Sequence, residues 1–184
     1  MRSRGITLLE LLVSIAVMGI MATIAIPPFS NLVKNSKIST SLNNLTADLY
    51  LARHTAIKHN SHAVICPRNS SNNDCSGSAD WENGWIVFID NNKDGKCEFI
   101  SDLCADKGKI IKIGEGITSK DLKMRGYGHR NYRIRYDPMG FSYAYNGKVI
   151  ACDDRGKGYA RGIVISNSGR VRATHKGEKL ICKS

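Results

Sequence analysis

Residues 5–12, GITLLELL, are the most informative segment of this 184-residue chain, because they begin a long apolar helix behind a short leader. A short basic leader precedes it, and an apolar run extends from Ile6 to Ile26, the 21 residues that an α-helix needs to cross a bilayer core. Glu10 is the only charged residue in this run, and a carboxylate at membrane depth costs at least ~2.5 kcal/mol on insertion scales. We therefore expect Glu10 to have a partner. An ordinary secretory signal places small residues after its apolar core. Gly5 comes before the core, so cleavage there would leave the hydrophobic helix on the mature protein.

The order of residues from Gly5 to Leu11 resembles the class III signal of type IV pilins and pseudopilins. In that signal a glycine is followed by a hydrophobic residue, threonine, leucine and then glutamate; Ile6 stands where phenylalanine is commonest. The resemblance implies that a prepilin peptidase cleaves after Gly5, that Ile6 is N-methylated, and that the protein is stored in the bacterial inner membrane before filament assembly. It also implies that Glu10 pairs with the N-terminal amine of a neighbouring pilin. A simple single-span membrane protein would explain neither Gly5 nor Glu10.

One long helix is predicted from about Ile6 to Lys58. Pro27-Pro28 should kink this helix without ending it, because helical spacing resumes afterwards. Apolar residues then recur at intervals of three and four, with polar residues between them. The apolar positions are Leu42, Leu45, Leu49, Ala52 and Ala56, and the polar ones are Asn43, Asn44, Asp48 and Arg53. The chain thus divides into a leader (1–5), a transmembrane or filament-core helix (6–28) and a periplasmic globular domain (29–184) with a basic C-terminal tail (about 152–184).

After residue 60 the pattern changes to short β-type runs separated by Gly, Asn, Asp and Ser. The predicted strands are Ala63–Ile65, Trp85–Ile89, Lys109–Ile113, Tyr132–Tyr136, Phe141–Tyr145, Val149–Cys152, Gly162–Ile165 and Arg170–Thr174. Asn146-Gly147 and Asn167-Ser168-Gly169 are predicted hairpin turns. A long helix packed on an antiparallel sheet makes this an α+β, pilin-like fold.

Six cysteines indicate a disulfide framework formed in an oxidising compartment. The sequential pairs are favoured because each brackets a polar or Gly-rich segment, although six cysteines allow 15 pairings. These pairs are Cys66 with Cys75, Cys97 with Cys104, and Cys152 with Cys182. Zinc sites usually use Cys-x-x-Cys spacings, and this sequence has none. We therefore expect no metal site.

Further segments resemble the FimT/GspH family of minor pilins and pseudopilins. They are Cys66-Pro67, the run from Trp81 to Asp90 with its Gly84-Trp85 pair, and the stretch from Cys152 to Arg172. The family has two uses. GspH-like members cap the pseudopilus of type II secretion, and FimT-like members belong to type IV pili and are associated with DNA capture during natural transformation. The Gly-Arg-x-Arg element at residues 169–172, with a cysteine-closed basic tail, resembles the FimT-like members.

The positive charge of the chain is concentrated in its last third. Residues 1–119 have a net charge of +1, whereas residues 120–184 hold 15 basic and 5 acidic side chains, a net charge of +10. Such asymmetry indicates a polyanionic partner. As a strand, residues 170–176 place Arg170, Arg172 and Lys176 on one face, where arginine forks can bind successive phosphates. Lys179, Arg161 and Arg155 are expected to extend this double-stranded DNA-binding set; the alternative is an exposed edge hairpin whose charges discourage aggregation.

Three other motifs are interpreted as structural or are absent. Arg133 and Arg135 alternate with Tyr132, Ile134 and Tyr136, and the tyrosines are expected to be core residues rather than base-stacking platforms. Asp90-x-Asn92-x-Asp94-Gly95 imitates the start of a calcium loop, but position twelve is Ser101 instead of glutamate, so we expect a hairpin loop. No nucleophile elbow or Walker loop is present in the sequence, so we expect neither an enzyme nor a cofactor.

Two functions remain. The first is a minor type IV pilin that binds double-stranded DNA and presents it for uptake in natural transformation, partnered by other pilins at the cell surface. The second is a GspH-like minor pseudopilin of a type II secretion system, with a structural and priming role. The basic tail and the Gly-Arg-x-Arg element favour the first.

Overall fold

The computed structural model describes residues 7–69, 71, 74–100, 103–117, 119, 121–128, 132–175, 178 and 180–182, and only the backbone of 24–27. The chain forms two compact units, residues 1–37 and 38–184. Gly5 and Ile6, the predicted cleavage and methylation sites, lie outside the described residues, as do Lys176 and Lys179 of the predicted DNA-binding set.

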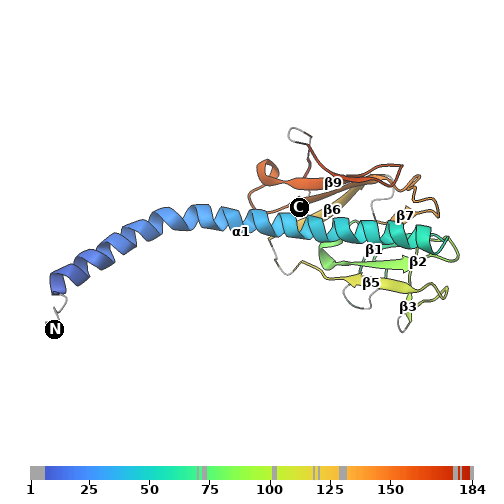
Figure 1. Ribbon diagram of the computed structural model, residues 1–184, viewed down its shortest axis with the longest axis horizontal. Coiled ribbons are helices and arrows are strands. Elements are labelled where there is room, and N and C mark those ends of the chain that lie inside the picture. The colour runs from blue at the N-terminus through green and yellow to red at the C-terminus, as the bar shows by residue number, and fades with distance from the viewer. Residues whose placement is uncertain are drawn as a thin grey trace. The chain divides into compact units, whose positions relative to one another are not determined.

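The predicted long helix is present as α1, Leu8–Lys58 (Figure 1). Over the described residues no single straight helix is long and apolar enough to span a membrane. The segments Leu8–Thr23 and Pro28–Lys58, which meet at a bend of 42°, together satisfy that test by length and composition. The bend lies where the prolines predict a kink. Apolar side chains such as those of Leu8 and Met18 are largely exposed, as expected for a segment whose cover is lipid or other subunits.

Thr7 and Glu10 close the first turn of α1 as a capping box. The Glu10 backbone N–H donates to Thr7 Oγ1 at 3.2 Å, and the Thr7 N–H donates to Glu10 Oε2 at 3.0 Å. Thr7 thus satisfies one exposed helix N–H, and the glutamate satisfies another. Within one chain Glu10 therefore accepts hydrogen bonds from Thr7, and its pairing with the N-terminal amine of a neighbouring pilin stays a prediction.

The second half of α1 supplies one wall of the core in the unit 38–184. All five predicted apolar positions from Leu42 to Ala56 are buried, and Ile38 extends the same stripe. Asp48, predicted to lie on the polar face, is instead 3% exposed. Its carboxylate accepts hydrogen bonds from Trp85 Nε1 at 2.8 Å and from Lys112 Nζ at 2.6 Å, which explains how a charged residue can be buried on this face.

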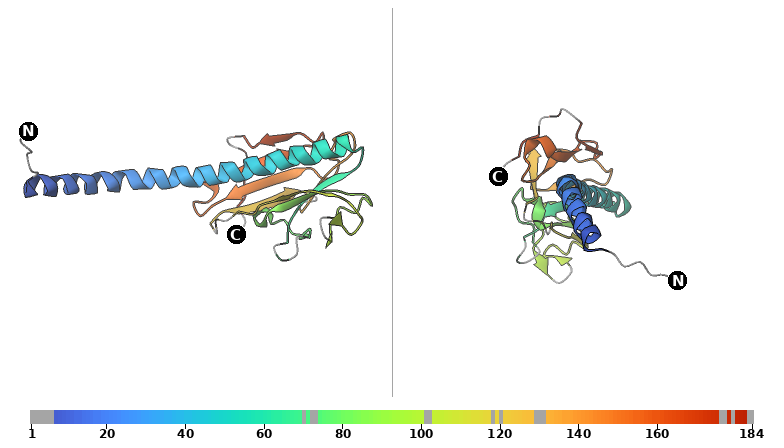
Figure 2. Two further views of the ribbon diagram at one scale, coloured as in Figure 1. Left: turned by 60° about the horizontal axis from the view of Figure 1, so that its bottom comes forward. Right: turned by 90° about the vertical axis from the view of Figure 1, so that its left-hand side faces the viewer.

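Two four-stranded antiparallel sheets share this core (Figures 1 and 2). The first sheet has the order β5-β2-β1-β7, and the second has the order β10-β9-β8-β6. The strands of the first sheet are β1 (Ala63–Pro67), β2 (Trp85–Ile89), β5 (Ile110–Gly114) and β7 (Ile134–Tyr136). Those of the second are β6 (Lys123–Gly128), β8 (Gly147–Cys152), β9 (Arg161–Ile165) and β10 (Val171–Ala173). A two-stranded sheet joins β3 (Phe99–Ile100) to β4 (Leu103–Cys104), and two short 3-10 helices are η1 (Trp81–Asn83) and η2 (Lys157–Tyr159).

Two local predictions were wrong. Phe141–Tyr145 is a turn region and not a strand: the Tyr145 N–H donates to the Ser142 carbonyl at 3.2 Å, and Ala144 has a positive φ of 59°. Asn146-Gly147 is not a hairpin turn, since Gly147 already belongs to β8 and β7 lies in the other sheet. Strand β6 was not predicted, since its sequence, KMRGYG, holds two glycines and lacks β-branched residues.

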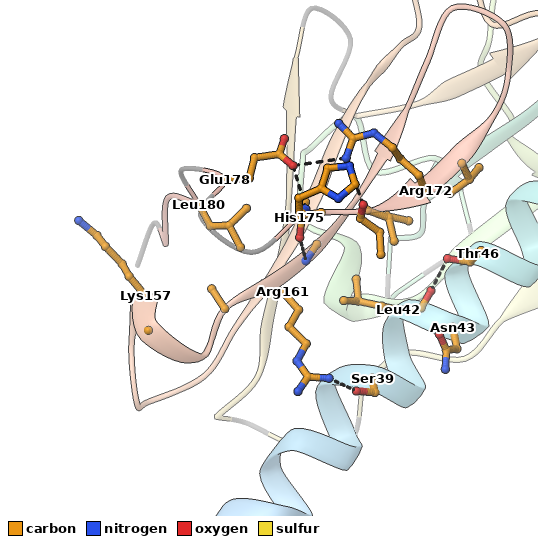
Figure 3. A pocket seen from close by; sticks show the side chains of 17 residues that line it. Ser39, Leu42, Asn43, Thr46, Lys157, Arg161, Arg172, His175, Glu178 and Leu180 are labelled. Carbon is orange, nitrogen blue, oxygen red and sulfur yellow. Dashed lines mark hydrogen bonds and ion pairs between the residues drawn. The ribbon is translucent and has the colours of Figure 1, made fainter.

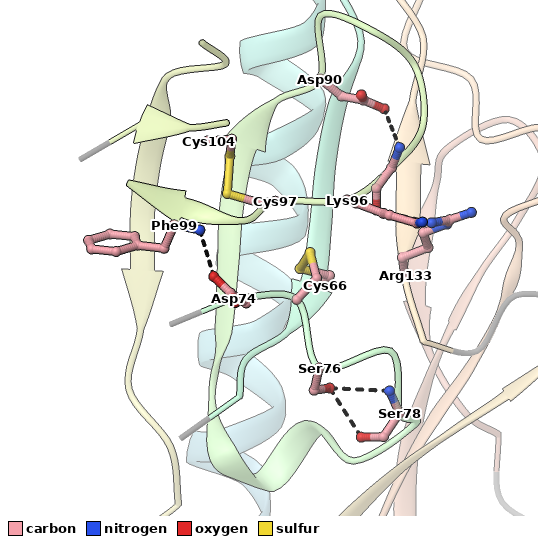
Figure 4. The surroundings of a disulfide bond; sticks show 12 residues. Cys66, Asp74, Ser76, Ser78, Asp90, Lys96, Cys97, Phe99, Cys104 and Arg133 are labelled. Atoms are coloured by element: carbon pink, nitrogen blue, oxygen red, sulfur yellow. Dashed lines mark hydrogen bonds between the residues drawn. A yellow bond between two sulfur atoms is a disulfide. The ribbon is translucent and has the colours of Figure 1, made fainter. Parts of the chain in front are cut away.

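The structure has the three disulfides expected from the sequence: Cys66–Cys75, Cys97–Cys104 and Cys152–Cys182. The first starts from Cys66 in β1 and the second ends at Cys104 in β4, and near them Asp74 Oδ1 accepts the Phe99 N–H at 2.6 Å (Figure 4). The third encloses 30 residues and ties the C-terminal tail to the end of β8.

Candidate nucleic-acid interface

The hairpin from β9 to β10 positions the Gly-Arg-x-Arg element. Gly169 closes its turn with φ +75°, and a Cβ there would lie 2.1 Å from the Gly140 carbonyl oxygen, so only glycine fits. From α1, Arg53 Nη2 donates to the Ser168 carbonyl at 3.1 Å. The turn is therefore held from two sides, and the strand that follows it begins in a defined position.

The side chains of residues 170–172 alternate as the sequence predicts. Val171 is buried in the core, whereas Arg170 is exposed. No hydrogen bond or ion pair engages the Arg170 guanidinium among the described residues. Arg172 is half-exposed, and its Nη1 lies 3.4 Å from Glu178 Oε2. Since β10 is the edge strand of the second sheet, both guanidiniums lie on an accessible border of the molecule.

The sheet register aligns Arg172 with one residue from each of the other three strands of the second sheet. Arg172 of β10 pairs with Val164 of β9, and Val164 pairs with Lys148 of β8, which pairs with Tyr127 of β6. Neighbours such as Val149 and Ile163 face the core, so the row lies on the opposite, outer face of the second sheet.

The chain after β10, here called the terminal segment of the tail, passes over this outer face at its described residues 178 and 180–182. Glu178 contacts both Lys148 and Arg172, and Tyr127 Oη donates to the Ile181 carbonyl at 2.7 Å. Because Lys148, the His175 N–H and Arg172 all donate to the Glu178 carboxylate, its pKa is lowered to about 2. Glu178, Ile181 and Cys182 are therefore each tied to the second sheet, by ion pairs, a hydrogen bond and the Cys152–Cys182 disulfide respectively.

Arg161 lies on the core-facing side of β9, and at the sheet edge it borders the same groove as Arg172. It shares the parity of Ile163 and Ile165 in β9, which points toward α1, and its Nη1 donates to Ser39 Oγ at 2.8 Å (Figure 3). It borders a groove of about 830 Å³ between α1, the β9–β10 edge and the tail. The groove is lined by Ser39, Asn43, Thr46, Arg161, Arg172 and Glu178, among others.

Arg155 is held inside its own loop. Its guanidinium donates to Asp153 Oδ2 through Nε at 3.0 Å and Nη2 at 2.6 Å, and lies 4.2 Å from the centroid of the Tyr159 ring. The side chain is only 11% exposed. This arrangement stabilises the loop after β8, and the structure does not bring Arg155 to the face that carries Arg170 and Arg172.

A family match accounts for this architecture. Residues 41–169 match the family described as Type II transport protein GspH, and residues 1–26 match the prokaryotic N-terminal methylation motif. The chain belongs to the GspH family. It is thus a type IV minor pilin or pseudopilin, and its methylation motif and N-terminal helix are consistent with membrane anchoring and pilus assembly.

Similar proteins are pilins. A fimbrial protein of Pseudomonas aeruginosa is 27% identical over 153 residues, which cover 77% of this chain and 92% of that protein. Two crystal forms of the P. aeruginosa type IV minor pilin FimU share the fold. Their TM-scores are 0.58 and 0.53 at 14% and 17% identity, covering 78% and 74% of this chain and 92% of FimU in each case.

The second Arg-x-Arg pair of this pilin, Arg133 and Arg135, serves the fold. Arg133 Nη1 donates to the Gly95 carbonyl at 3.1 Å, and Arg135 Nη1 donates to the Lys93 carbonyl at 2.8 Å. Arg135 also lies 4.5 Å from the centroid of the Tyr145 ring. As the sequence indicates, Tyr136 belongs to the core.

The calcium-like segment of the pilin is a loop, but not the hairpin expected, because β2 pairs with β1 and β5 and not with β3. Asp90 Oδ2 accepts the Gly95 N–H at 3.1 Å, and burial raises the pKa of this carboxyl. Over the described residues, no group of three or more His, Cys, Asp or Glu side chains could hold a metal ion.

Sequence reasoning missed four residues of this region: Arg53, Lys148, Glu178 and Ser39. Arg53 and Ser39 come from α1, more than 100 residues before their partners, so local patterns carry no signal for them. One signal was available for Glu178. It is the only acidic residue from Arg155 to the C-terminus, among eight lysines and arginines.

Proposed function

We propose that this protein is a minor type IV pilin that binds double-stranded DNA through its C-terminal region and serves DNA uptake in natural transformation. The observation that carries the proposal is Arg170, whose exposed guanidinium directly precedes the edge strand β10, lies two residues before Arg172 and follows the turn closed by Gly169. Next-but-one side chains on a strand lie roughly 6.8 Å apart, so the two guanidiniums can meet successive phosphates. Such contacts position a duplex without reading its sequence.

The arrangement favours backbone contacts over base contacts. Arginine binds phosphate with two hydrogen bonds, and the local excess of positive charge attracts the duplex before contact. A tail already fixed by the disulfide and by Tyr127 loses little conformational entropy on binding. Lys176 and Lys179 belong to the proposed contact set because they flank Glu178 in the same tail. Arg161 is a peripheral contact, since it points toward α1.

A titration tests the proposal. The fragment from Phe29 onward retains every residue of the core and all three disulfides. It should bind duplex DNA with a Kd of ~10⁻⁴–10⁻⁶ M, the usual range for non-specific contacts. Arg170→Gln with Arg172→Gln should weaken binding at least about tenfold and lower the log–log salt slope by roughly two, at nearly constant Tm.

The matched control is Lys107→Gln with Lys109→Gln, which removes the same charge from exposed positions between β4 and β5. It should change affinity less than about twofold, because its effect is only long-range. Equal weakening by both pairs, or no binding by the unaltered fragment at low salt, would remove the basis of the DNA-binding function.

Maturation is proposed to follow the pilin route. A prepilin peptidase cleaves after Gly5, Ile6 is methylated, and residues 6–28 anchor the protein in the inner membrane with residues 29–184 in the periplasm. On assembly, Glu10 exchanges its Thr7 hydrogen bonds for the N-terminal amine of a neighbouring pilin. Intact-mass measurement should give a chain that begins at Ile6 with one added methyl group; a different start would contradict this route.

The second candidate is a minor pseudopilin of a type II secretion system, favoured by the description of the matching family. Deleting the gene in the native bacterium separates the two. Loss of transformation with intact protein secretion supports the DNA-uptake pilin, and the reverse supports the pseudopilin.

A further inference from the structure

Glu178 makes contacts that resemble those of a bound anion. Its carboxylate accepts hydrogen bonds from Lys148 Nζ, from Arg172 Nη1 at 3.4 Å and from the His175 backbone N–H at 3.2 Å. The three donors come from β8, β10 and the tail, so they converge from different parts of the second sheet. Two cations and one backbone N–H around an oxyanion are also the groups with which proteins hold phosphate.

The register of the sheet explains this convergence. Lys148 and Arg172 flank Val164 in one row across three strands, which places their Cα atoms about 10 Å apart. Two long cationic side chains at that separation can close on one anion between them. The site is open to solvent, since the side chains of Lys148 and Arg172 are 36% and 39% exposed.

We propose that Lys148, Arg172 and the His175 N–H form an oxyanion site that Glu178 fills in the free protein, and that a DNA phosphate displaces Glu178 on binding. This inference rests on the proposed DNA-binding function and deepens it. It adds Lys148 to the contact residues and makes Glu178 an internal competitor of DNA. Solvent-exposed ion pairs are weak, so a polyanion that brings several phosphates can displace one carboxylate.

Displacement, and not protonation, opens the site. The same three donors keep the pKa of Glu178 at about 2, so the carboxylate stays charged at any pH near neutrality. The Cys152–Cys182 bridge keeps the tail near the sheet while Glu178 moves, because it anchors the chain four residues beyond it.

Glu178→Gln tests the competition. Glutamine keeps the size of the side chain but removes the charge, so duplex DNA should bind at least about threefold tighter at fixed salt, with a log–log salt slope steeper by up to about 0.9. Glu115→Gln is the matched control: it makes the same charge change at an exposed position after β5, in the other sheet. Affinity of the Glu178 variant equal to or weaker than that of the control would overturn the proposal.

A double-mutant cycle tests the role of Lys148. In the otherwise unaltered protein Lys148→Gln removes a phosphate contact but also weakens the hold on Glu178, so the two effects offset and DNA affinity should change by less than about twofold. In the Glu178→Gln background the same change should weaken binding at least about threefold. Residues that share a contact are expected to couple in this way. Additive effects would overturn the proposed competition.

Pyrophosphate separates this inference from the proposed function. Titrated into the Glu178→Gln protein, it should shift the backbone amide NMR signal of His175, and into the unaltered protein it should shift that signal much less. If this holds while DNA does not bind, the oxyanion site stands and the DNA function fails. If DNA binds but pyrophosphate leaves the His175 signal of the variant unmoved, the oxyanion site fails.

Discussion

Two strands of this molecule carry the same Arg-x-Arg pattern, and the fold uses them differently. Arg133, directly before β7, and Arg135, on β7, donate to loop carbonyls at positions 95 and 93, and Arg135 stacks on Tyr145. Directly before β10, the Arg170 guanidinium engages no partner among the described residues, whereas on β10 Arg172 Nη1 donates to the Ala173 carbonyl at 3.1 Å and pairs with Glu178. The comparison teaches that the pattern alone does not define a phosphate site. The arginine most available to a ligand is the one whose guanidinium the fold leaves exposed and without a partner, which among the described residues is the case for Arg170.

The largest expected effect comes from the Cys152–Cys182 bridge behind β10. Replacing both cysteines by serine should lower the free energy of unfolding by about 3–4 kcal/mol in loop-entropy estimates, because the bridge encloses 30 residues. DNA affinity should fall about threefold, since the tail is no longer fixed. Denaturant unfolding and a DNA titration measure the two effects.

Its control is Cys66→Ser with Cys75→Ser, which opens a shorter loop beside the first sheet. That variant should lose stability but bind DNA unchanged when folded. If both variants weaken DNA binding equally, the tail has no special role.

Gly169→Ala should have the next largest effect. The added Cβ requires a left-handed backbone for alanine and collides with the Gly140 carbonyl, which should lower the unfolding free energy by about 3 kcal/mol. DNA affinity should fall as well, because Arg170 follows directly on this turn. Gly156→Ala is the control, since its φ is also positive but no atom lies within 4 Å of the added Cβ. A loss for Gly169→Ala no larger than that of the control would show that the packed turn does not position the hairpin.

Replacing each arginine pair by glutamine tests directly whether the two pairs have different roles. Arg133→Gln with Arg135→Gln should lower the unfolding free energy by about 2 kcal/mol, since two hydrogen bonds to carbonyls and a cation–π contact are lost. DNA affinity should stay within about twofold. Arg170→Gln with Arg172→Gln should weaken DNA binding at least about tenfold and leave the unfolding free energy nearly unchanged. Parallel losses of stability and of binding in both pairs would mean that the two strands do not differ in use.

The smallest effect concerns pH. The folded-state pKa of Glu178, about 2, lies below its ordinary value of 4.5, so its contribution to stability is present above pH 4.5 and is lost as pH falls toward 2. Glu178→Gln should therefore lose less Tm between pH 5 and pH 2.5 than the unaltered protein. Identical Tm changes in the two proteins would show that the carboxylate gains nothing from Lys148 and Arg172.

Much of the fold was predictable because its signals are local. The apolar stripe from Leu42 to Ala56, the β-branched run of β1 and the turn at 167–169 each depend on a few neighbouring residues. The errors arose where a distant or polar contact overrode the pattern. Asp48 is buried because Trp85 and Lys112 donate hydrogen bonds to its carboxylate, and 141–145 is a turn closed by the hydrogen bond from the Tyr145 N–H to the Ser142 carbonyl.

The candidate site was predictable only in part. Arg170 was identified from its motif and is exposed, whereas Arg155 was included for its charge and is held by Asp153, two residues away. Arg161 was expected to converge with Arg170, but the parity of β9 turns it toward α1. Charge could be read from the sequence, whereas the face on which each charge lies required the strand register.

The class of this protein, a pilin-like α+β fold, could be predicted from the sequence alone. Its signals are a glycine before an apolar helix with one glutamate and a helical stripe that continues past two prolines. Short strands, paired cysteines and a basic last third complete them. These properties follow from composition and spacing, which a chain has before it folds. Which of the basic side chains are paired with a carboxylate could be seen only in the tertiary structure. It sets Lys148 and Arg172 in one row, 24 residues apart in the chain, and lays Glu178 between them. The physical reason is that an ion pair depends on distances of a few ångströms between side chains, and sheet register and a disulfide, not sequence separation, set those distances.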